Sequence, residues 1–254
     1  MTLRTQLNAI VRLCYFNGVL PLGRQPLLTA AVFLTPFSFL FFLFVIAPHQ
    51  YFAFGVVGGV MFTALFTGNG MLNDCAYLRL ERQLQQVFVA SPVRPISYVL
   101  GMALSELAFT IPALTLFFAI LFLVHPFSVA VFFTLVGVVL VTWLMATSLG
   151  FLISTFFRQL REIWPIGTLT FSTLSVLPPV FYPITTIDAD YRWVAFIAPS
   201  TWGAVLSDQV VGIGSGITVS PSWLGSPLVE VAVLLLSAGA FALGAVSLAR
   251  WREP

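Results

Sequence analysis

The sequence contains no lysine, because all eleven of its basic residues are arginine. A chain without lysine has no Walker A motif to hold ATP phosphates and no amine to form a Schiff base. Charged residues make up only 8% of the 254 positions, whereas a soluble domain carries about a quarter. Hydrophobic residues reach 59% and the mean hydropathy is +1.01. These values exclude an ordinary soluble domain and predict a polytopic membrane protein.

Cysteine and histidine are scarce as well, with two of each in the chain. Two cysteines form neither a disulfide framework nor a zinc site, which usually takes four ligands. The net charge of +2 is too small to indicate nucleic-acid binding. No Ser–His–Asp set, His-Glu-x-x-His motif or paired-aspartate motif is present in the sequence. We therefore expect no catalytic site, no metal, no cofactor on this chain and no nucleic-acid partner, and a function in transport.

Long apolar stretches predict the fold class, an all-α membrane protein with six transmembrane helices in a single domain over residues 1–254. A helix needs about 20 apolar residues to cross the hydrocarbon core. Six stretches between residues 27 and 249 satisfy this length: Leu27–Ala47, Tyr51–Leu72, Tyr98–Val124, Phe127–Phe157, Ile163–Phe181 and Leu228–Ala249.

The arginines predict the orientation of these spans. Ten of the eleven fall before the first span, after the last span, or in the connections that face the same side, and only Arg192 falls on the other. By the positive-inside rule, the arginine-bearing side is the cytoplasm. We expect a multi-pass protein of the cell membrane with both termini in the cytoplasm. Cys14 and Cys75 then lie on or near the reducing side and are expected to be free thiols.

Two segments outside the spans are expected to lie at the membrane surface. Within residues 1–26, Leu3, Leu7, Ile10 and Cys14 recur at helical spacing, which predicts an interfacial amphipathic helix in place of a plain flanking segment. Residues 182–227 connect the fifth and sixth spans and contain prolines and tryptophans. We expect this external region to re-enter the membrane or to lie in its interface.

A few residues in the spans are candidates for a substrate pathway. Glu106 lies within the third span, where a charge costs about 2.5–3.5 kcal/mol on insertion scales. It is either a substrate or proton site, or a protonated side chain that faces a neighbouring helix. We expect no second intramembrane charge to pair with it. Asn69 lies near Asn73 and Asp74 at the cytoplasmic end of the second span, and Phe37 represents the phenylalanine-rich first span.

The connection between the second and third spans, residues 73–96, mixes leucines with charged residues and glutamines. This pattern predicts an amphipathic cytoplasmic helix that ends before Pro92, since proline disfavours the helical conformation of the residue before it. Taken alone, such a helix is either a surface connector or a docking site for a soluble partner.

Three segments of the chain carry recognisable motifs in a fixed order: Leu84–Arg94, Ser148–Arg161 and Leu177–Ser207. They are preceded by an Arg-Gln-Pro entry to the first span. In this order and register they resemble the type-2 ABC exporter permeases, the membrane subunits of drug and polysaccharide exporters, and together the matches extend over nearly the whole chain. The chain departs from the family pattern at Gln83, Gln85 and Gln86, where members often have acidic residues and a glycine.

The resemblance implies partners and a mechanism. Family permeases form dimers, here expected to be homodimers, and each permease binds a separate ABC ATP-binding subunit that holds ATP and Mg²⁺. Residues 73–96 would be the coupling loop, and the N-terminal helix would extend its surface. Movement between inward-facing and outward-facing states would follow ATP binding and hydrolysis. The residues expected to contact the ATPase are Arg79, Glu81, Arg82, Pro92 and Arg94.

Four functions remain open at this point. The first is export of a hydrophobic or amphipathic compound, drug-like as in multidrug efflux or lipid-like. The second is export of a lipid-linked glycan by the same kind of permease. The third is a membrane enzyme that modifies a lipid with Glu106, or with Asp188 and Asp190, as its carboxylates. The fourth is a secondary transporter with Glu106 as proton carrier, which predicts an inverted internal repeat that the sequence does not show by eye.

Overall fold

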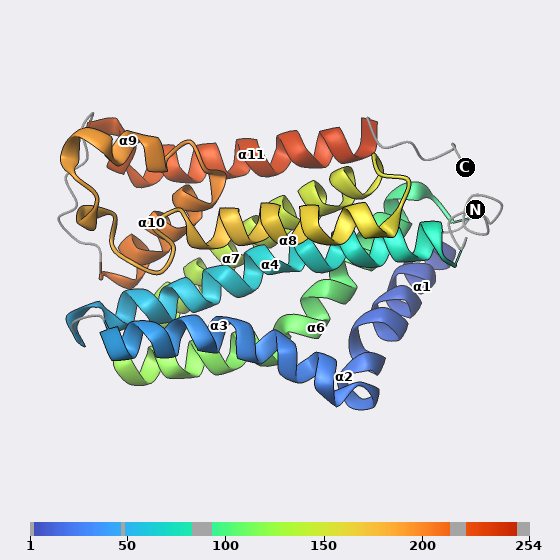
Figure 1. Cartoon of the computed structure of the whole chain (residues 1–254), viewed down its shortest axis with the longest axis horizontal. Helices are drawn as coiled ribbons and strands as arrows, with labels where there is room; N and C mark the ends of the chain where they lie inside the picture. Colours follow the sequence, from blue (N-terminus) through green and yellow to red (C-terminus); the bar gives the residue numbers. More distant parts are fainter. Residues whose placement is uncertain (1–2, 47–48, 83–92, 214–221, 248–254) are drawn as a thin grey trace.

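The computed structural model describes residues 3–46, 49–82, 93–213 and 222–247. Over these ranges the chain forms helices and turns, with no β-strand among them. Figure 1 shows the long helices lying along one axis, with α1 running obliquely to them at one end. The elements in chain order are α1 (Leu3–Cys14), η1 (Tyr15–Val19), α2 (Leu20–Arg24), α3 (Pro26–Ile46), η2 (His49–Tyr51), α4 (Phe52–Leu80), α6 (Pro95–Val124), α7 (Val129–Ser154), α8 (Leu160–Val176), η3 (Ile184–Thr186), η4 (Ala189–Tyr191), α9 (Arg192–Ala195), α10 (Pro199–Val211), η5 (Ser222–Gly225) and α11 (Pro227–Ser247).

Local sequence explains where several helices begin and end. Pro95 and Pro199 occupy the first turns of α6 and α10, where a missing backbone N–H breaks no intrahelical bond. The hydroxyl of Ser128 accepts a hydrogen bond from the N–H of Val131 at 3.3 Å and caps α7. Helix α10 ends at Gly212, whose φ of 86° lies in the left-handed region that glycine adopts without steric cost.

Four helices are long and apolar enough to cross a membrane, namely α4, α6, α7 and α11, with 29, 30, 26 and 21 residues. Each corresponds to a predicted span. The predicted spans that begin at Leu27 and Ile163 correspond to α3 and α8. Helix α3 has 21 residues, as many as α11, and α8 has 17. The total of six spans stays a prediction.

Helix α4 is longer than the span predicted for it. The sequence pattern suggests a span that ends at Leu72 and a separate amphipathic helix that begins near Cys75. In the structure one continuous helix runs from Phe52 to Leu80. The first residues of the predicted coupling loop are therefore a direct extension of a core helix. Residues 83–92 of that loop, Pro92 among them, lie outside the described residues.

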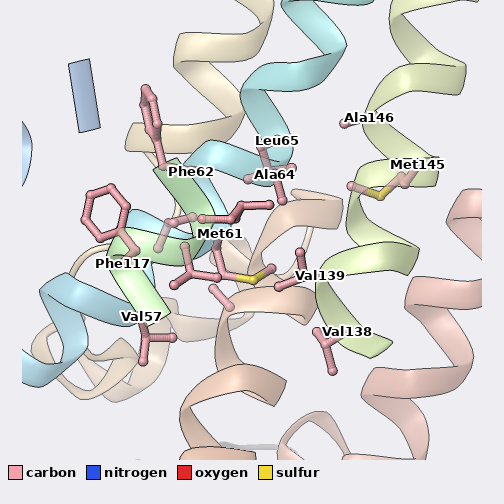
Figure 2. Close-up of a cluster of buried hydrophobic side chains, with 14 of the residues drawn as sticks. Val57, Met61, Phe62, Ala64, Leu65, Phe117, Val138, Val139, Met145 and Ala146 are labelled. Atoms are coloured by element: carbon pink, nitrogen blue, oxygen red, sulfur yellow. The ribbon is translucent and has the colours of Figure 1, made fainter. Parts of the chain in front are cut away.

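The core forms around α4, which is buried on most sides. Its fully buried side chains include Val57, Met61 and Leu65, which meet Phe117 from α6 and Val139 from α7 (Figure 2). Helices α3, α6, α7, α8 and α10 all contact α4. Contact on so many sides makes α4 the central helix of the bundle.

Helices α4 and α7 approach closely at two glycines. A β-carbon at Gly150 of α7 would collide with the carbonyl oxygen of Gly68 of α4. The backbones therefore touch here without intervening side chains, as small residues permit in membrane helices. This contact places the ends of α4 and α7 next to each other.

Eight of the arginines in the described ranges lie in elements, or at helix ends, that meet at one end of the bundle. This is the end where α1 begins and α11 finishes at Ser247 (Figure 1). Helix α9, which begins at Arg192, lies at the opposite end (Figure 1). We refer to the first as the arginine-rich end, and its members are Arg4, Arg12, Arg24, Arg79, Arg82, Arg94, Arg158 and Arg161.

At the opposite end, part of the predicted external region packs into the bundle. Helix α10 contacts α4, α7 and α11, and most of its side chains are buried. The hydroxyl of Ser207 lies 3.2 Å from the sulfur of Met61 on α4. The indole of Trp202 donates a hydrogen bond to the carbonyl oxygen of Phe196 at 2.8 Å and so connects α10 with the turn before it.

The N-terminal helix α1 packs against α6. The side chain of Gln6 is buried, and its carbonyl oxygen accepts a hydrogen bond from the backbone N–H of Arg94 at 3.0 Å, immediately before α6. On the other side of α1, Leu3, Leu7 and Val11 form an exposed apolar stripe at spacing i, i+4 and i+8. An amphipathic helix at residues 3–14 is therefore present, and no other described residue covers its apolar face.

Cys14 and Cys75 are both free thiols in the structure, as the sequence suggests. The thiol of Cys14, at the end of α1, donates a weak hydrogen bond to the carbonyl oxygen of Leu104 at 3.5 Å. Burial raises the pKa of the Cys14 thiol, which keeps it in the less reactive neutral form.

The α4–α7 contact predicts a stability difference between two glycines of the same helix. Replacement of Gly150 by alanine places a β-carbon against the α4 backbone and costs about 1–3 kcal/mol. For a chain of this size we expect the melting temperature of the purified protein to fall by roughly 2–10 °C. Gly137, also in α7, has nothing within 4 Å of such an atom, so Gly137→Ala is the matched control. Equal melting temperatures for both variants would contradict the contact.

Candidate functional site

A cavity of about 570 Å³ lies between α4, α6, the middle of α3 at Thr35 and Pro36, and the η1–α2 segment. On α4 its wall runs from Phe62 to Leu78, which corresponds to about 24 Å of helix. It approaches the arginine-rich end at Tyr77 and Leu78. We call it the α4–α6 cavity, and its lining residues are Phe16, Asn17, Pro21, Gln25, Thr35, Pro36, Phe62, Thr63, Phe66, Thr67, Asn69, Gly70, Asn73, Asp74, Tyr77, Leu78, Glu106, Phe109 and Thr110.

Two carboxyl groups meet in the wall of this cavity. The side chains of Asp74 on α4 and Glu106 on α6 are joined by a hydrogen bond. The expectation that Glu106 has no charged partner is therefore wrong. It fails because Asp74 and Glu106 lie on different spans, and only the packing of α4 on α6 brings them together. A hydrogen bond between two carboxyl groups requires a proton on at least one of them, so the pair carries at most one negative charge.

The two carboxyl groups differ in their surroundings. Glu106 is 7% exposed, and a β-carbon at Gly70 would collide with its Oε2 atom, so glycine at that position makes room for the side chain. Asp74 is exposed, and it faces the cavity that it lines. Asp74 is thus the member of the pair that a molecule in the cavity would meet first.

Asparagines continue the polar strip of α4. The amide of Asn73 donates a hydrogen bond to Oδ1 of Asn69 at 3.3 Å. The other end of that side chain, Asn73 Oδ1, is buried and has no hydrogen-bond partner among the described residues. Asn69, which the sequence suggests as a pathway residue, therefore lies in the same wall as Glu106.

Threonines and aromatic residues make up much of the remaining wall. The hydroxyls of Thr63, Thr67 and Thr110 donate to carbonyl oxygens of their own helices, at 2.7, 2.6 and 3.0 Å. These threonines use their donors internally, as is common in membrane helices. The aromatic lining residues are Phe16, Phe62, Phe66, Tyr77 and Phe109.

Phe37, the third predicted pathway residue, is not among the cavity lining. Its ring stacks on Phe117 with centroids 4.7 Å apart, on the core side of α3. Its neighbours Thr35 and Pro36 line the cavity instead. The apolar first span gave no signal to separate these adjacent positions.

A pattern in the sequence of α4 corresponds to the cavity wall. Thr63, Thr67, Gly70, Asp74 and Tyr77 follow one another at spacings of four, three, four and three residues. Residues at such spacings share one face of a helix. A small or polar stripe along an otherwise apolar span indicates a face turned away from lipid.

The predicted coupling residues connect to different parts of the bundle. The guanidinium of Arg79 donates to the carbonyl oxygen of Thr155 at 2.9 Å and also to those of Ser154 and Phe157. It therefore caps the C-terminal end of α7, where unpaired carbonyls favour a cation. Arg79 lies inside the fold and connects the end of α4 with the α7–α8 turn.

Arg82 and Arg94 connect to the cavity wall and to α1. Arg82 donates from Nε to the hydroxyl of Tyr77 at 2.9 Å, and its guanidinium carbon lies 5.5 Å from the centre of that ring. Arg94 holds Gln6 through its backbone, while its side chain is exposed. Glu81 is exposed at the end of α4.

A second polar cluster, missed by the sequence analysis, lies between α10 and α11. The amide of Gln209 donates to Glu230 at 3.1 Å and to the carbonyl oxygen of Gly225 at 3.2 Å. Asp208 and Glu230 are 3% and 0% exposed, and each has one buried oxygen without a partner among the described residues. This cluster joins α10 to α11 at the end opposite the arginines.

The described residues form an all-helical bundle with four helices long and apolar enough to cross a membrane and a cavity in its side, an architecture that suits a membrane transport protein. The chain matches the ABC-2 type transporter family over residues 11–208 and belongs to that family. No curated protein matches it. Members of the family are membrane permeases of ABC exporters, typically without an ATPase of their own, and they normally pair with an ABC ATP-binding subunit.

The hydrogen bonds of Arg79 predict a structural effect. Replacement by glutamine removes a charged donor from three helix-end carbonyls and costs about 1–3 kcal/mol. We expect a lower melting temperature of the purified chain. Arg158, exposed in the α7–α8 turn, provides the control Arg158→Gln with the same loss of charge. A melting temperature for Arg79→Gln as high as that of the control would show that the cap contributes little.

Proposed function

We propose that this chain is the permease subunit of an ATP-driven exporter that moves a hydrophobic or amphipathic compound out of the cytoplasm. The observation that carries the proposal is the α4–α6 cavity. Its volume of about 570 Å³ falls in the range of small-molecule sites, and its wall combines aromatic rings with a few polar groups. An apolar cargo with one polar group is the chemistry that such a wall accommodates.

The topology we propose has six spans with both termini in the cytoplasm. In support, α3 and α8 extend alongside the four long helices, and eight arginines gather at one end of the bundle (Figure 1). The cavity then approaches the cytoplasm at Tyr77 and Leu78. Helix α1 lies in the inner membrane interface with its exposed leucines toward lipid. The external region, residues 182–227, re-enters the membrane through α10.

The proposed motor is a separate ATP-binding subunit, with ATP and Mg²⁺ bound on that partner. It docks on the coupling loop, residues 73–96, through Glu81, Arg82, Pro92 and Arg94. Arg79 has a different role in this proposal, because its guanidinium is engaged by the end of α7. It passes movement of the loop to the α7–α8 turn.

Alternating access then follows from three connections of one loop. Arg82 touches Tyr77 in the cavity wall, Arg79 holds α7, and the backbone of Arg94 holds α1. Closure of the ATP-binding subunits displaces the loop, and all three attachments move with it as rigid bodies. A second copy of the permease, forming a homodimer, completes the pathway and covers the open side of the cavity.

The alternative functions receive less support from the structure. A lipid-linked glycan is larger than the small-molecule range into which this cavity falls. The carboxylates suggested for a lipid-modifying enzyme lie in two separate places, Glu106 beside Asp74 in the α4–α6 cavity and Asp188 with Asp190 beside α9.

A cavity-filling variant tests export. Thr35→Trp places a large ring in the α4–α6 cavity, so ATP-dependent transport of a fluorescent hydrophobic compound such as Nile red should fall about tenfold or more. Transport is measured in proteoliposomes that contain the permease and its ATPase. Thr134→Trp, exposed on α7 outside the cavity, is the matched control. Normal transport by Thr35→Trp, with the control also normal, would exclude this cavity from the pathway.

Charge reversal tests docking of the ATPase. Arg82→Glu should weaken co-purification of the ATP-binding subunit, because interface charges contribute to association. Asp190→Arg, an equally large charge change at the exposed opposite end, should leave co-purification unchanged. Retention of the ATPase by Arg82→Glu would remove Arg82 from the interface.

A further inference from the structure

The charged side chains that line the α4–α6 cavity have one sign. Among the described residues, the carboxyl groups of Asp74 and Glu106 belong to the lining, and neither arginine nor histidine does. Of the arginines close by on α4, Arg79 is bound to the carbonyl oxygens at the end of α7. Arg82 lies against the ring and hydroxyl of Tyr77. The charge that the described lining can carry is therefore negative.

The size of that charge follows from the contact between the two acids. Because their hydrogen bond requires at least one proton, Asp74 and Glu106 together carry at most a single negative charge. The accessible member is Asp74. One positive charge placed beside Asp74 balances the pair, whereas two would not be matched.

The wall offers several hydrogen-bond acceptors beside the acidic pair. Asn73 Oδ1 is a buried acceptor without a partner in the described part of the chain, and the carboxyl oxygens are acceptors as well. The threonine hydroxyls have already given their donors to helix carbonyls. A wall of this kind favours a cargo that brings donors or a positive charge, and disfavours an anion.

Aromatic rings supply the rest of the lining. Phe16, Phe62, Phe66, Phe109 and Tyr77 come from η1, α4 and α6 and line the same cavity as the acidic pair. Their faces attract cations as well as apolar groups, at about 0.5–2 kcal/mol for a desolvated cation. An apolar body with one delocalised positive charge would use both kinds of group.

We propose that the α4–α6 cavity selects lipophilic monocations, with the Asp74–Glu106 pair as the charge-selective element and the aromatic lining as the site for the apolar body. This inference rests on the proposed function, since it names the class of compound exported. It excludes lipophilic anions as good ligands. Neutral compounds of the same size bind with intermediate affinity.

A pair of probes with the same shape and opposite charge tests the charge preference. Tetraphenylphosphonium and tetraphenylborate differ essentially in the sign of one central charge. Saturable binding of each is measured on the full chain in phosphatidylcholine nanodiscs, with the signal of empty nanodiscs subtracted. We expect a Kd for the phosphonium at least about tenfold lower than for the borate, which corresponds to about 1.4 kcal/mol.

Variants locate the preference. Asp74→Asn combined with Glu106→Gln removes the charge with little change in shape, and the preference should fall to less than about threefold. Asp188→Asn combined with Glu162→Gln replaces the same number of carboxyl groups at exposed positions outside the cavity and should keep it. A melting curve for each variant establishes that it is folded. The comparison of the two ions on the unaltered chain needs no variant.

Three results would overturn the inference: equal affinity for the two ions, no saturable phosphonium binding, or an undiminished preference in the folded cavity variant. Transport in proteoliposomes separates this failure from failure of the proposed function. ATP-dependent movement of Nile red together with equal binding of both ions rejects charge selection and leaves the exporter in place. Absence of ATP-dependent movement of either ion and of Nile red rejects the export function itself.

Discussion

The burial of α4 is the constraint on which the rest of the structure depends. Helices α3, α6, α7, α8 and α10 surround it, and the α7 backbone touches it at Gly68. Because α4 is packed on so many sides, its rotation about its own axis is fixed. The stripe of small and polar residues along α4 therefore faces in one direction only. That direction is the gap toward η1 and α2, and the α4–α6 cavity forms there.

The arrangement of the long helices follows from the sequence because lipid leaves the backbone few choices. Each exposed peptide group in hydrocarbon costs several kcal/mol, so apolar stretches of about 20 residues become helices. The predicted boundaries of the third and sixth spans lie close to Pro95–Val124 and Pro227–Ser247. The end of α4 was less predictable, because an amphipathic segment continues a helix as readily as it begins one.

The candidate site was only partly predictable, because it depends on contacts between helices. Glu106 and Asn69 stand out as polar residues in apolar spans, but their common wall requires the rotation of α4 against α6. Arg79 and Arg82 are both arginines at the end of α4, about one helical turn apart, and the sequence alone does not distinguish them. Only the proximity of the α7 end assigns the first to a helix cap and the second to a surface residue. The spacing of residues within one helix contains no information on how close they lie to another helix.

A chain this poor in charge keeps acids in its bundle where each has a compensating arrangement. A charged side chain at mid-membrane costs about 2.5–3.5 kcal/mol on insertion scales. The hydrogen bond between Asp74 and Glu106 leaves at most one charge in place of two, and Asp74 keeps access to the cavity. Asp208 and Glu230 lie instead beside Gln209 and fully within the α10–α11 contact. The buried acids Asp208 and Glu230 lie outside the α4–α6 cavity, which suits a structural role in holding α10 to α11. The pair of Asp74 and Glu106 lines a cavity, which suits a role in contact with cargo.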